Sequence, residues 1–243
     1  MKIAVLSDIH GNMFALRAVL EDMKQFNIER IFCLGDLAMA GPEPNKTIDY
    51  VRTQDWTVIQ GNTDEMIACY SDDVYNAVKA GASIMANALE QDVKEISDEN
   101  KKYLKNLPIN KCVEIEGLKI LLVHGSPRRN NENVFPNMDM NIIEDIFNEV
   151  DADVVFCGHT HMPCGYQTNS KLTIVNDGSV GRPFTENPKA CYVIADINNG
   201  NIEIEHRMID YDKTSAVAML EKRQFEGAEK LAQMLINPEK RHM

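Results

Sequence analysis

Residues 153–163 read Asp-Val-Val-Phe-Cys-Gly-His-Thr-His-Met-Pro, an apolar run that leads directly into two histidines separated by one threonine. The part from Asp153 to Phe156 has the length and composition of a buried strand. A turn after a strand need not keep the side-to-side alternation of the pleat, so His159 and His161 can point at one spot. Two solvated imidazoles on a surface turn would give the same pattern, so this stretch alone does not predict a binding site.

Four further apolar runs end in the same way, next to a side chain that can bind a metal. They are residues 3–6 before Asp8 and His10, 30–34 before Asp36, 56–59 before Asn62, and 119–123 before His124. If these strands lie side by side in one sheet, their carboxyl ends converge on a single edge. Four of the six histidines fall in these motifs, which favours a binding site over a solvated turn.

The side chains at these strand ends offer oxygen and nitrogen donors and no thiolate. They are Asp8, His10, Asp36, Asn62, His124, His159 and His161. This donor set suits two divalent first-row transition metals, with manganese or iron favoured over zinc, nickel or cobalt. It does not suit calcium or magnesium sites built from oxygen alone.

The composition is that of an acidic globular protein, with 243 residues, 44% hydrophobic residues and a net charge of -12. One domain spanning residues 1–243 is expected at this length. The negative charge disfavours nucleic acid as a partner, because such binding depends on Lys and Arg that neutralise phosphates. Small anionic substrates remain compatible if metal ions supply positive charge. The chain begins directly with a strand and has no run of about 18 apolar residues, so we expect a cytoplasmic protein without membrane contact.

The remaining segments predict how the domain is built. Residues about 66–108 carry helical periodicity and read as a helical insertion. Strand-like runs at 172–175, 191–194 and 202–205 look antiparallel and linked by hairpins, with an Asn-Gly turn before the last. Residues about 213–235 predict a closing amphipathic helix.

In their order along the chain, these motifs resemble those of the calcineurin-like metallophosphoesterase superfamily, from Lys2 to about Ala195. Within it the chain is most similar to the small bacterial and archaeal phosphodiesterase-like branch, through residues 8–12, 123–127 and 178–183. The insertion resembles that of a longer subgroup, some of whose members are similar to diadenosine-polyphosphate hydrolases. The resemblance implies an α/β fold, a four-layer αββα sandwich of two mixed sheets flanked by helices.

The resemblance also implies a role for each ligand. It places Asp8, His10, Asp36 and His161 on a first metal, and Asn62, His124 and His159 on a second, with Asp36 bridging the two. Together the two metals would lower the pKa of a shared water, and the resulting hydroxide would attack phosphorus in line. Asp36 and Asn62 are therefore counted as catalytic as well as metal-binding.

One position departs from the pattern of the superfamily. Many members follow the metal-binding asparagine with a histidine that assists the leaving group, whereas this chain has Thr63 and then Asp64. Threonine cannot act as an acid near neutral pH, so the proton for the leaving group would come from water, from Asp64 or from no group at all. A preference for good leaving groups follows.

Four other residues are candidates for substrate contact, each with a plain structural alternative. Arg128 could clamp a phosphate, with a catalytic effect, or could be a solvated loop charge. Asn12 could touch the substrate or form a turn. Ser179 and Arg182 lie in a Gly-rich loop that the superfamily brings near the site, but the loop could equally be a tight turn between strands.

Three classes of function remain compatible with these motifs. The favoured one is a two-metal phosphoesterase acting on small phosphodiesters or nucleotide phosphoanhydrides, so that its partner is a small phosphorylated molecule. A phosphomonoesterase, protein phosphatase or nuclease could use the same site. A non-catalytic scaffold, as in the retromer subunit that resembles this fold, is the third. The insertion would cap the site, cover a sheet edge or form a homodimer contact.

Overall fold

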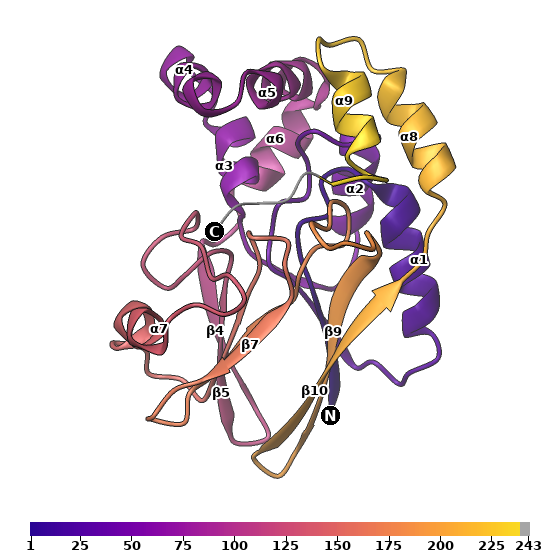
Figure 1. The fold of residues 1–243 in the computed structure, drawn as a ribbon. Helices are drawn as coiled ribbons and strands as arrows, with labels where there is room; N and C mark the ends of the chain where they lie inside the picture. The colour runs from indigo at the N-terminus through magenta and orange to yellow at the C-terminus, as the bar shows by residue number, and fades with distance from the viewer. Residues whose placement is uncertain (239–243) are drawn as a thin grey trace.

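The structure is a computed structural model that describes residues 1–238, and its centre is a pair of five-stranded sheets (Figure 1). The first sheet has the order β10-β9-β1-β2-β3, and the second has the order β4-β5-β6-β8-β7. The strands are β1 (Lys2–Leu6), β2 (Arg30–Cys33), β3 (Thr57–Val58), β4 (Asn110–Ile115), β5 (Leu118–Val123), β6 (Val154–Cys157), β7 (Cys164–Gln167), β8 (Thr173–Asn176), β9 (Ala190–Asn198) and β10 (Asn201–Ile209). Both sheets are mixed, because β1–β2–β3 and β5–β6–β8 pair in parallel, whereas β9 and β10 in the first sheet and β4 and β7 in the second pair antiparallel.

Alternate residues of the central strands pack into different layers. Ile3 and Val5 of β1 join Phe156 of β6 in the core between the sheets. Ala4 and Leu6 face the other way, onto the helices that cover the first sheet. These helices are α1 (Met13–Met23), α2 (Pro44–Val51) and α8 (Lys213–Glu221), and α7 (Met140–Phe147) covers the second sheet. The predicted αββα layering of the α/β fold is confirmed.

A group of helices lies at the end of the sheets away from the turn between β9 and β10, at the top of Figure 1. Four of them connect β3 to β4: α3 (Asn62–Ala68), α4 (Asp72–Gly81), α5 (Ser83–Glu95) and α6 (Asp98–Lys105). The fifth, α9 (Ala228–Gln233), packs against α5. The helical segment therefore begins at Asn62, a few residues earlier than the sequence suggested. That residues 1–243 form one domain remains a prediction.

Two expectations about the last third of the chain were wrong. The expected closing helix is divided into α8, which ends at Glu221, and α9, which begins after Gly227 adopts a φ of +97° as its N-cap. The strand expected at 172–175 does not form a hairpin with those after it. Instead β8 pairs with β6 in parallel and with β7 antiparallel, and the chain then crosses to the first sheet, where β9 and β10 do form the expected hairpin.

Two elements of the structure, α2 and β7, were not predicted from the sequence. Helix α2 and strand β7 are short and carry few apolar residues, so their periodicity gives little signal. Among residues 1–238, no helix combines the length and the apolar character needed to cross a bilayer.

The fold predicts that alanine substitutions at Gly41 and at Gly81 have very different effects on stability. A Cβ atom on Gly41 would lie 1.4 Å from the carbonyl oxygen of His10, whereas one on Gly81 would meet nothing within 4 Å. Gly41→Ala should lower the free energy of unfolding by roughly 1–3 kcal/mol or more through overpacking. Gly81→Ala, which adds the same methyl group, should leave it within about 1 kcal/mol of wild type. Urea unfolding measures both, and equal midpoints for the two variants would contradict the packing described.

Candidate metal centre

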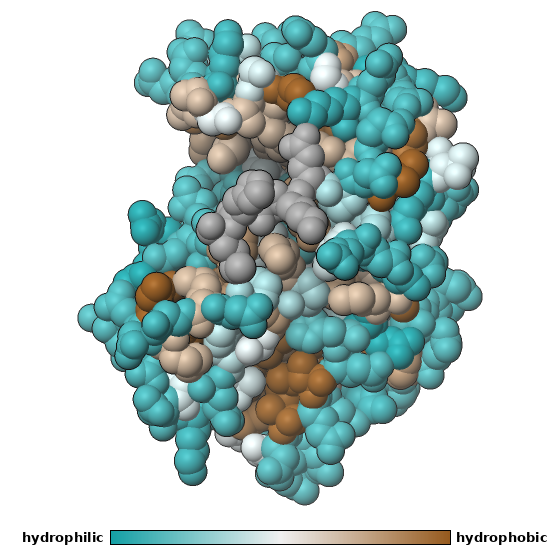
Figure 2. All heavy atoms as spheres, in the orientation of Figure 1, coloured by the Kyte–Doolittle hydropathy of each residue, from teal (hydrophilic) through white to brown (hydrophobic). Residues whose placement is uncertain are grey.

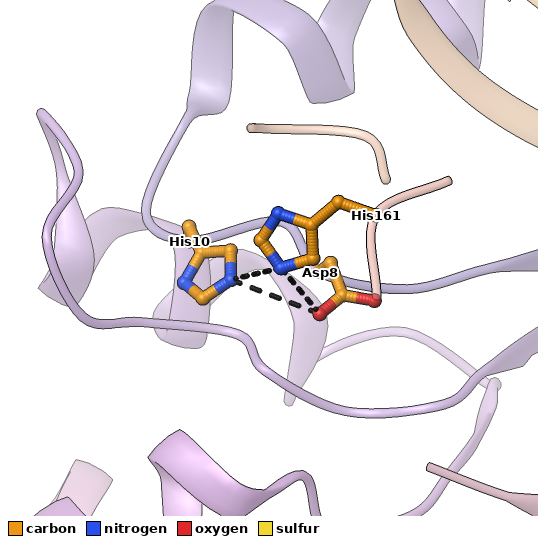
Figure 3. A group of neighbouring side chains, drawn as sticks. All are labelled: Asp8, His10 and His161. Atoms are coloured by element: carbon orange, nitrogen blue, oxygen red, sulfur yellow. Dashed lines mark hydrogen bonds and ion pairs between the residues drawn. The ribbon is translucent and has the colours of Figure 1, made fainter. Parts of the chain in front are cut away.

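The side chains expected to bind metals meet at the carboxyl ends of the central strands. His10 Nε2 lies 3.1 Å from His161 Nε2, and His161 Nε2 lies 3.1 Å from Asp8 Oδ1, so the three side chains point at a common centre (Figure 3). His124 Nε2 lies 3.5 Å from Asp36 Oδ1. These contacts form two groups that share Asp8, one made with His10 and His161 and the other with Asp36 and His124.

Asn62 joins the second group together with His159. The amide oxygen Oδ1 of Asn62 lies 3.0 Å from His124 Nε2 and 2.8 Å from His159 Nδ1. His10 Nε2 lies 3.6 Å from Asp36 Oδ2, so Asp36 faces both groups. All seven residues expected from the sequence are thus brought together.

Five of these seven residues adopt left-handed backbone conformations. The φ angles are 52° for Asp8, 47° for His10, 55° for Asp36, 68° for His159 and 61° for His161. Such conformations cost on the order of 1–3 kcal/mol each and persist only where the surrounding structure imposes them. These five residues lie in the loops just past the ends of β1, β2 and β6, and the left-handed turns there let side chains two residues apart converge on one centre, whereas in a straight strand they would stand parallel on one face.

Backbone carbonyl groups fix how the imidazole rings are protonated. The Nδ1 atom of His10 lies 3.0 Å from Met39 O, that of His161 lies 2.6 Å from Arg182 O, and that of His124 lies 2.8 Å from Leu34 O. A carbonyl oxygen only accepts hydrogen bonds, so each Nδ1 must donate. In the neutral ring the lone pair of Nε2 then faces the centre, as in metal-binding histidines.

The donor atoms fit divalent metal ions better than they fit one another. Asp8 Oδ1 is buried without a hydrogen-bond partner in the described part of the chain. The Nε2 atoms of His10 and His161 face each other at 3.1 Å, where neutral rings would have no hydrogen between them. A cation at this point would use all three donors. Imidazole and carboxylate ligands of this kind suit manganese, iron, cobalt, nickel or zinc.

Burial and the close approach of carboxylates and imidazoles set the charge states at the centre. Burial raises the pKa of Asp8, but the adjacent His161 and His124 outweigh it and hold that pKa well below its usual range. At Asp36, burial raises the pKa and the adjacent His124 lowers it by more, so that the pKa of Asp36 is about 2. Burial lowers the pKa of His124, yet Asp36 and Asp8 raise it to about 10. Both carboxylates are therefore ionised, and a metal that binds His124 must displace a proton.

A buried chain of hydrogen bonds orients the Asp8 carboxylate. Ser7 Oγ lies 2.5 Å from Asp8 Oδ2 and 2.7 Å from Asp177 Oδ1. A hydroxyl group has one hydrogen, and Asp8 is ionised, so the second hydrogen must come from Asp177. Burial and the charge of Asp8 raise the pKa of Asp177 well above its usual range, which keeps it protonated. Asp177 thus donates to Ser7 and Ser7 donates to Asp8, leaving Asp8 Oδ1 directed at the centre.

A second support holds the loop behind His10. Met39, whose carbonyl oxygen accepts from His10 Nδ1, and Ala40 have φ angles of 85° and 62°. The backbone N–H of Ala40 donates to Asp92 Oδ2 at 3.0 Å, and Arg223 Nη2 lies 2.6 Å from Asp92 Oδ1. Sequence reasoning missed these supports, because Asp92 in α5 and Arg223 between α8 and α9 are far along the chain and match no motif.

Three of the weaker sequence candidates have structural roles instead. Asn12 is buried, accepts from the N–H of Ala15 as the N-cap of α1, and donates to Gly181 O. Ser179 is buried and donates to the backbone oxygen of Asp8. Arg128 pairs with Glu132 and Asp145 and lines a separate surface cavity. The expected substrate contacts of these three residues are therefore corrected.

Asp64 is also unsuited to protonate a leaving group. Its side chain is fully buried, and its two oxygens accept from the backbone N–H groups of Asp36, Leu37 and Gly61 at 2.8, 2.9 and 3.0 Å. Burial and the charge of Asp36 raise its pKa to about 7. Its role is to hold the loop that carries Asp36, which corrects the catalytic role expected from the sequence.

A cavity of about 480 Å³ opens on the metal centre, a volume typical of small-molecule sites, which measure about 300–1,000 Å³. Its lining includes His10, Asp36, Asn62, His159 and His161. Arg182 lines it as well and keeps the position expected of a substrate contact. Thr63 also lies there, with its hydroxyl donated to Ala38 O.

Comparison with known proteins gives consistent matches. The model of the calcineurin-like phosphoesterase superfamily domain matches residues 1–200. An uncharacterized protein of Methanocaldococcus jannaschii is 34% identical over 227 residues, covering 86% of this chain and 88% of that protein. A metallophosphoesterase from Sphaerobacter thermophilus is 25% identical with a TM-score of 0.78, over 97% of this chain and 98% of that one. A hypothetical protein from Pyrococcus horikoshii OT3 shares the fold with a TM-score of 0.87 and 23% identity, over 99% of both chains.

The hydrogen-bond chain to Asp8 predicts how two variants of Asp177 differ. Asp177→Asn keeps a hydrogen donor for Ser7 and should retain metal affinity close to wild type. Asp177→Leu removes that donor and should weaken Mn²⁺ binding by about 10–100-fold, as is typical when the partner of a metal ligand is lost. Calorimetric titration with Mn²⁺ measures both variants, and equal affinities for Asp177→Leu and wild type would refute the orienting role.

Proposed function

The chain belongs to the calcineurin-like phosphoesterase superfamily, and we propose that it hydrolyses small phosphodiesters or nucleotide phosphoanhydrides with two divalent transition metals. The observation that carries this proposal is the convergence of seven oxygen and nitrogen donors on one buried centre beside a cavity of small-molecule size. Manganese and iron are the favoured metals. A cytoplasmic location belongs to the same proposal.

Each ligand has a place in the proposed centre. The first metal would be held by Asp8, His10, His161 and Asp36, and the second by Asn62, His124, His159 and Asp36. The position of Asp36 between His10 at 3.6 Å and His124 at 3.5 Å supports a bridging carboxylate. When bound, the two metals would activate a water molecule and neutralise charge on the phosphoryl oxygens.

The protein groups around the centre keep the ligands ready for this chemistry. Asp36 Oδ1 accepts from the N–H of Thr63 at 2.9 Å, which limits rotation of the bridging carboxylate. The N–H of His159 donates to Asp8 Oδ2 at 2.9 Å and so joins the two ligand groups. Arg182 lines the cavity and carries a positive charge that can orient a substrate anion. Preorganised ligands need little rearrangement during the reaction.

The leaving group receives little help from the side chains nearest the second metal. Thr63 uses its hydroxyl hydrogen on Ala38 O, and Asp64 is buried behind the loop. Neither can supply a proton to the departing oxygen. The substrates that suit such a site are those whose leaving group is already stable as an anion, such as nucleotide phosphates and aryl esters.

The alternatives have less support from the molecule. A cavity of about 480 Å³ closed on one side by helices suits a small molecule better than a folded protein or a nucleic acid. The net charge of -12 also disfavours nucleic acid. A non-catalytic scaffold would not need the complete set of ligands, nor the strained backbone that directs five of them to one centre.

Removal of the metals gives the most direct test of the proposal. Dialysis against EDTA should abolish hydrolysis of bis-p-nitrophenyl phosphate, and added Mn²⁺ should restore it. Asp36→Asn and His159→Ala should each lower kcat by at least about 100-fold, since even partners of metal ligands cost 10–100-fold. Arg128→Ala, on the far cavity, is the matched control and should leave kcat unchanged. Full activity after complete metal removal would refute the proposal.

The lack of a proton donor predicts how rate depends on the leaving group. For a series of aryl methyl phosphodiesters, kcat should fall steeply as the pKa of the leaving phenol rises, because the departing oxygen keeps its charge. Introduction of a histidine by Thr63→His should make the slope shallower. Stopped assays across four phenols measure the slope, and rates independent of phenol pKa would contradict this view of the site.

A further inference from the structure

The cavity beside the metal centre has two chemically different sides. Its floor is polar and consists of the proposed metal ligands. Its wall is apolar and is built by Met66 of α3, Val78 of α4, Met85 of α5, and Leu231 and Met234 from the last helical segment. In Figure 2 the surface is indented on the left, between the helices at the top and the sheets below, and tan residues lie along the upper edge.

The apolar wall is larger than a bare phosphate group would need. A phosphate held at the floor would place one of its ester substituents against the wall, since the floor already provides the polar contacts. Contact with this substituent would remove apolar surface from water on both sides. The wall therefore points to a substrate with a sizeable apolar group attached to its phosphate.

The side chains next to the floor favour an aromatic ring over an alkyl chain. The Phe184 ring stacks on His161 with centroids 5.0 Å apart and an interplanar angle of 26°. The guanidinium of Arg182 lies 6.0 Å from the Phe184 ring, and its Nη1 atom lies 3.6 Å from Met85 Sδ. Methionine sulfur and the planar guanidinium both make favourable contacts with aromatic faces.

This wall is specific to the helical parts of the chain. Leu231 and Met234 lie beyond residue 200, where the match to the superfamily domain ends. The turn before α9 is fixed on α5, because a Cβ atom on Gly227 would lie 2.5 Å from Ile84 Cγ2 and Asn87 donates to Glu226 O at 3.2 Å. The two helical segments thus form one surface.

We propose that this wall is a subsite for an aromatic ring joined, directly or through a sugar, to the phosphate at the metal centre. The inference rests on the proposed function and narrows its substrate class to aryl or nucleoside phosphoesters. The named wall residues have no side-chain hydrogen-bonding groups for the edges of a base. Polar groups that could contact the edges of a base come from elsewhere in the cavity lining, where Arg182 and Lys230 lie.

Binding of non-hydrolysed probes tests the subsite without requiring turnover. The Mn²⁺-loaded protein is titrated in a calorimeter with methylphosphonate and with phenylphosphonate, which share the phosphonate and differ in the ring. Phenylphosphonate should bind at least about tenfold more tightly, the lower end of what a hydrophobic pocket contributes per added group. AMP and ribose 5-phosphate form a second pair, which differ in the nucleobase. Tighter binding of AMP than of ribose 5-phosphate indicates a nucleoside substrate, whereas a ring preference in the phosphonate pair alone indicates a simple aryl ester.

A matched pair of variants locates the effect. Gly81 lines the cavity, and a side chain there would enter open space, so Gly81→Leu should fill the subsite and abolish the advantage of phenylphosphonate. Ala80→Leu adds the same side chain one residue away, at an exposed position outside the cavity lining, and should keep the advantage. Met234→Ala should reduce it without filling the cavity, with Met208→Ala on exposed β10 as its control.

The outcomes separate this inference from the proposed function. Equal affinities for the two phosphonates in wild type, with phosphodiester hydrolysis intact, would overturn the subsite and leave the function standing. A ring preference that Gly81→Leu abolishes, in a protein that hydrolyses no phosphodiester, would support the subsite and overturn the function. A ring preference that survives both Gly81→Leu and Met234→Ala would show that the ring binds elsewhere and would overturn the inference.

Discussion

The structure depends on holding ionised carboxylates and several imidazoles in one buried space without a polar solvent to separate them. Asp8 and Asp36 are buried and ionised, and they remain so because His124 and His161 stand beside them. The backbone must adopt left-handed conformations to bring these side chains together. Two sheets packed on a common core supply the rigidity that such strained residues need.

Three buried aspartic acid side chains that are not among the proposed metal ligands hold those ligands in position. Asp64 accepts from backbone N–H groups on both sides of Asp36, Asp92 holds the loop behind His10, and Asp177 acts through Ser7 on Asp8. Asp64 and Asp92 satisfy backbone donors that would otherwise be buried without partners, and protonated Asp177 supplies the hydrogen that Ser7 accepts; an unpaired polar group is costly in a medium of low dielectric constant. The carboxyl groups of these three residues form hydrogen bonds with the protein itself and not with a substrate.

The helical segments determine what can reach the centre. Helices α3–α5 and the segment that contains α9 come from distant parts of the sequence and meet over the ends of the strands (Figure 1). Arg223 ties the C-terminal segment to α5 through Asp92 and also donates to Gly41 O. The chemistry of the strand ends and the apolar surface offered to a substrate are therefore supplied by different layers of one fold.

The sequence by itself identified seven polar residues that each follow an apolar run, and the meeting of their side chains depends on two packed sheets, because β1, β2 and β3 belong to the first sheet and β5 and β6 to the second. The sequence could not determine what Asp64, Asn12, Ser179 or Arg128 would face, since a polar side chain near a motif can bond to backbone as readily as to substrate. Only the tertiary structure decided that Asp92, Asp177 and Arg223 support the centre and that β8 joins the second sheet. These contacts join residues that are far apart in sequence, and periodicity reports only on neighbours.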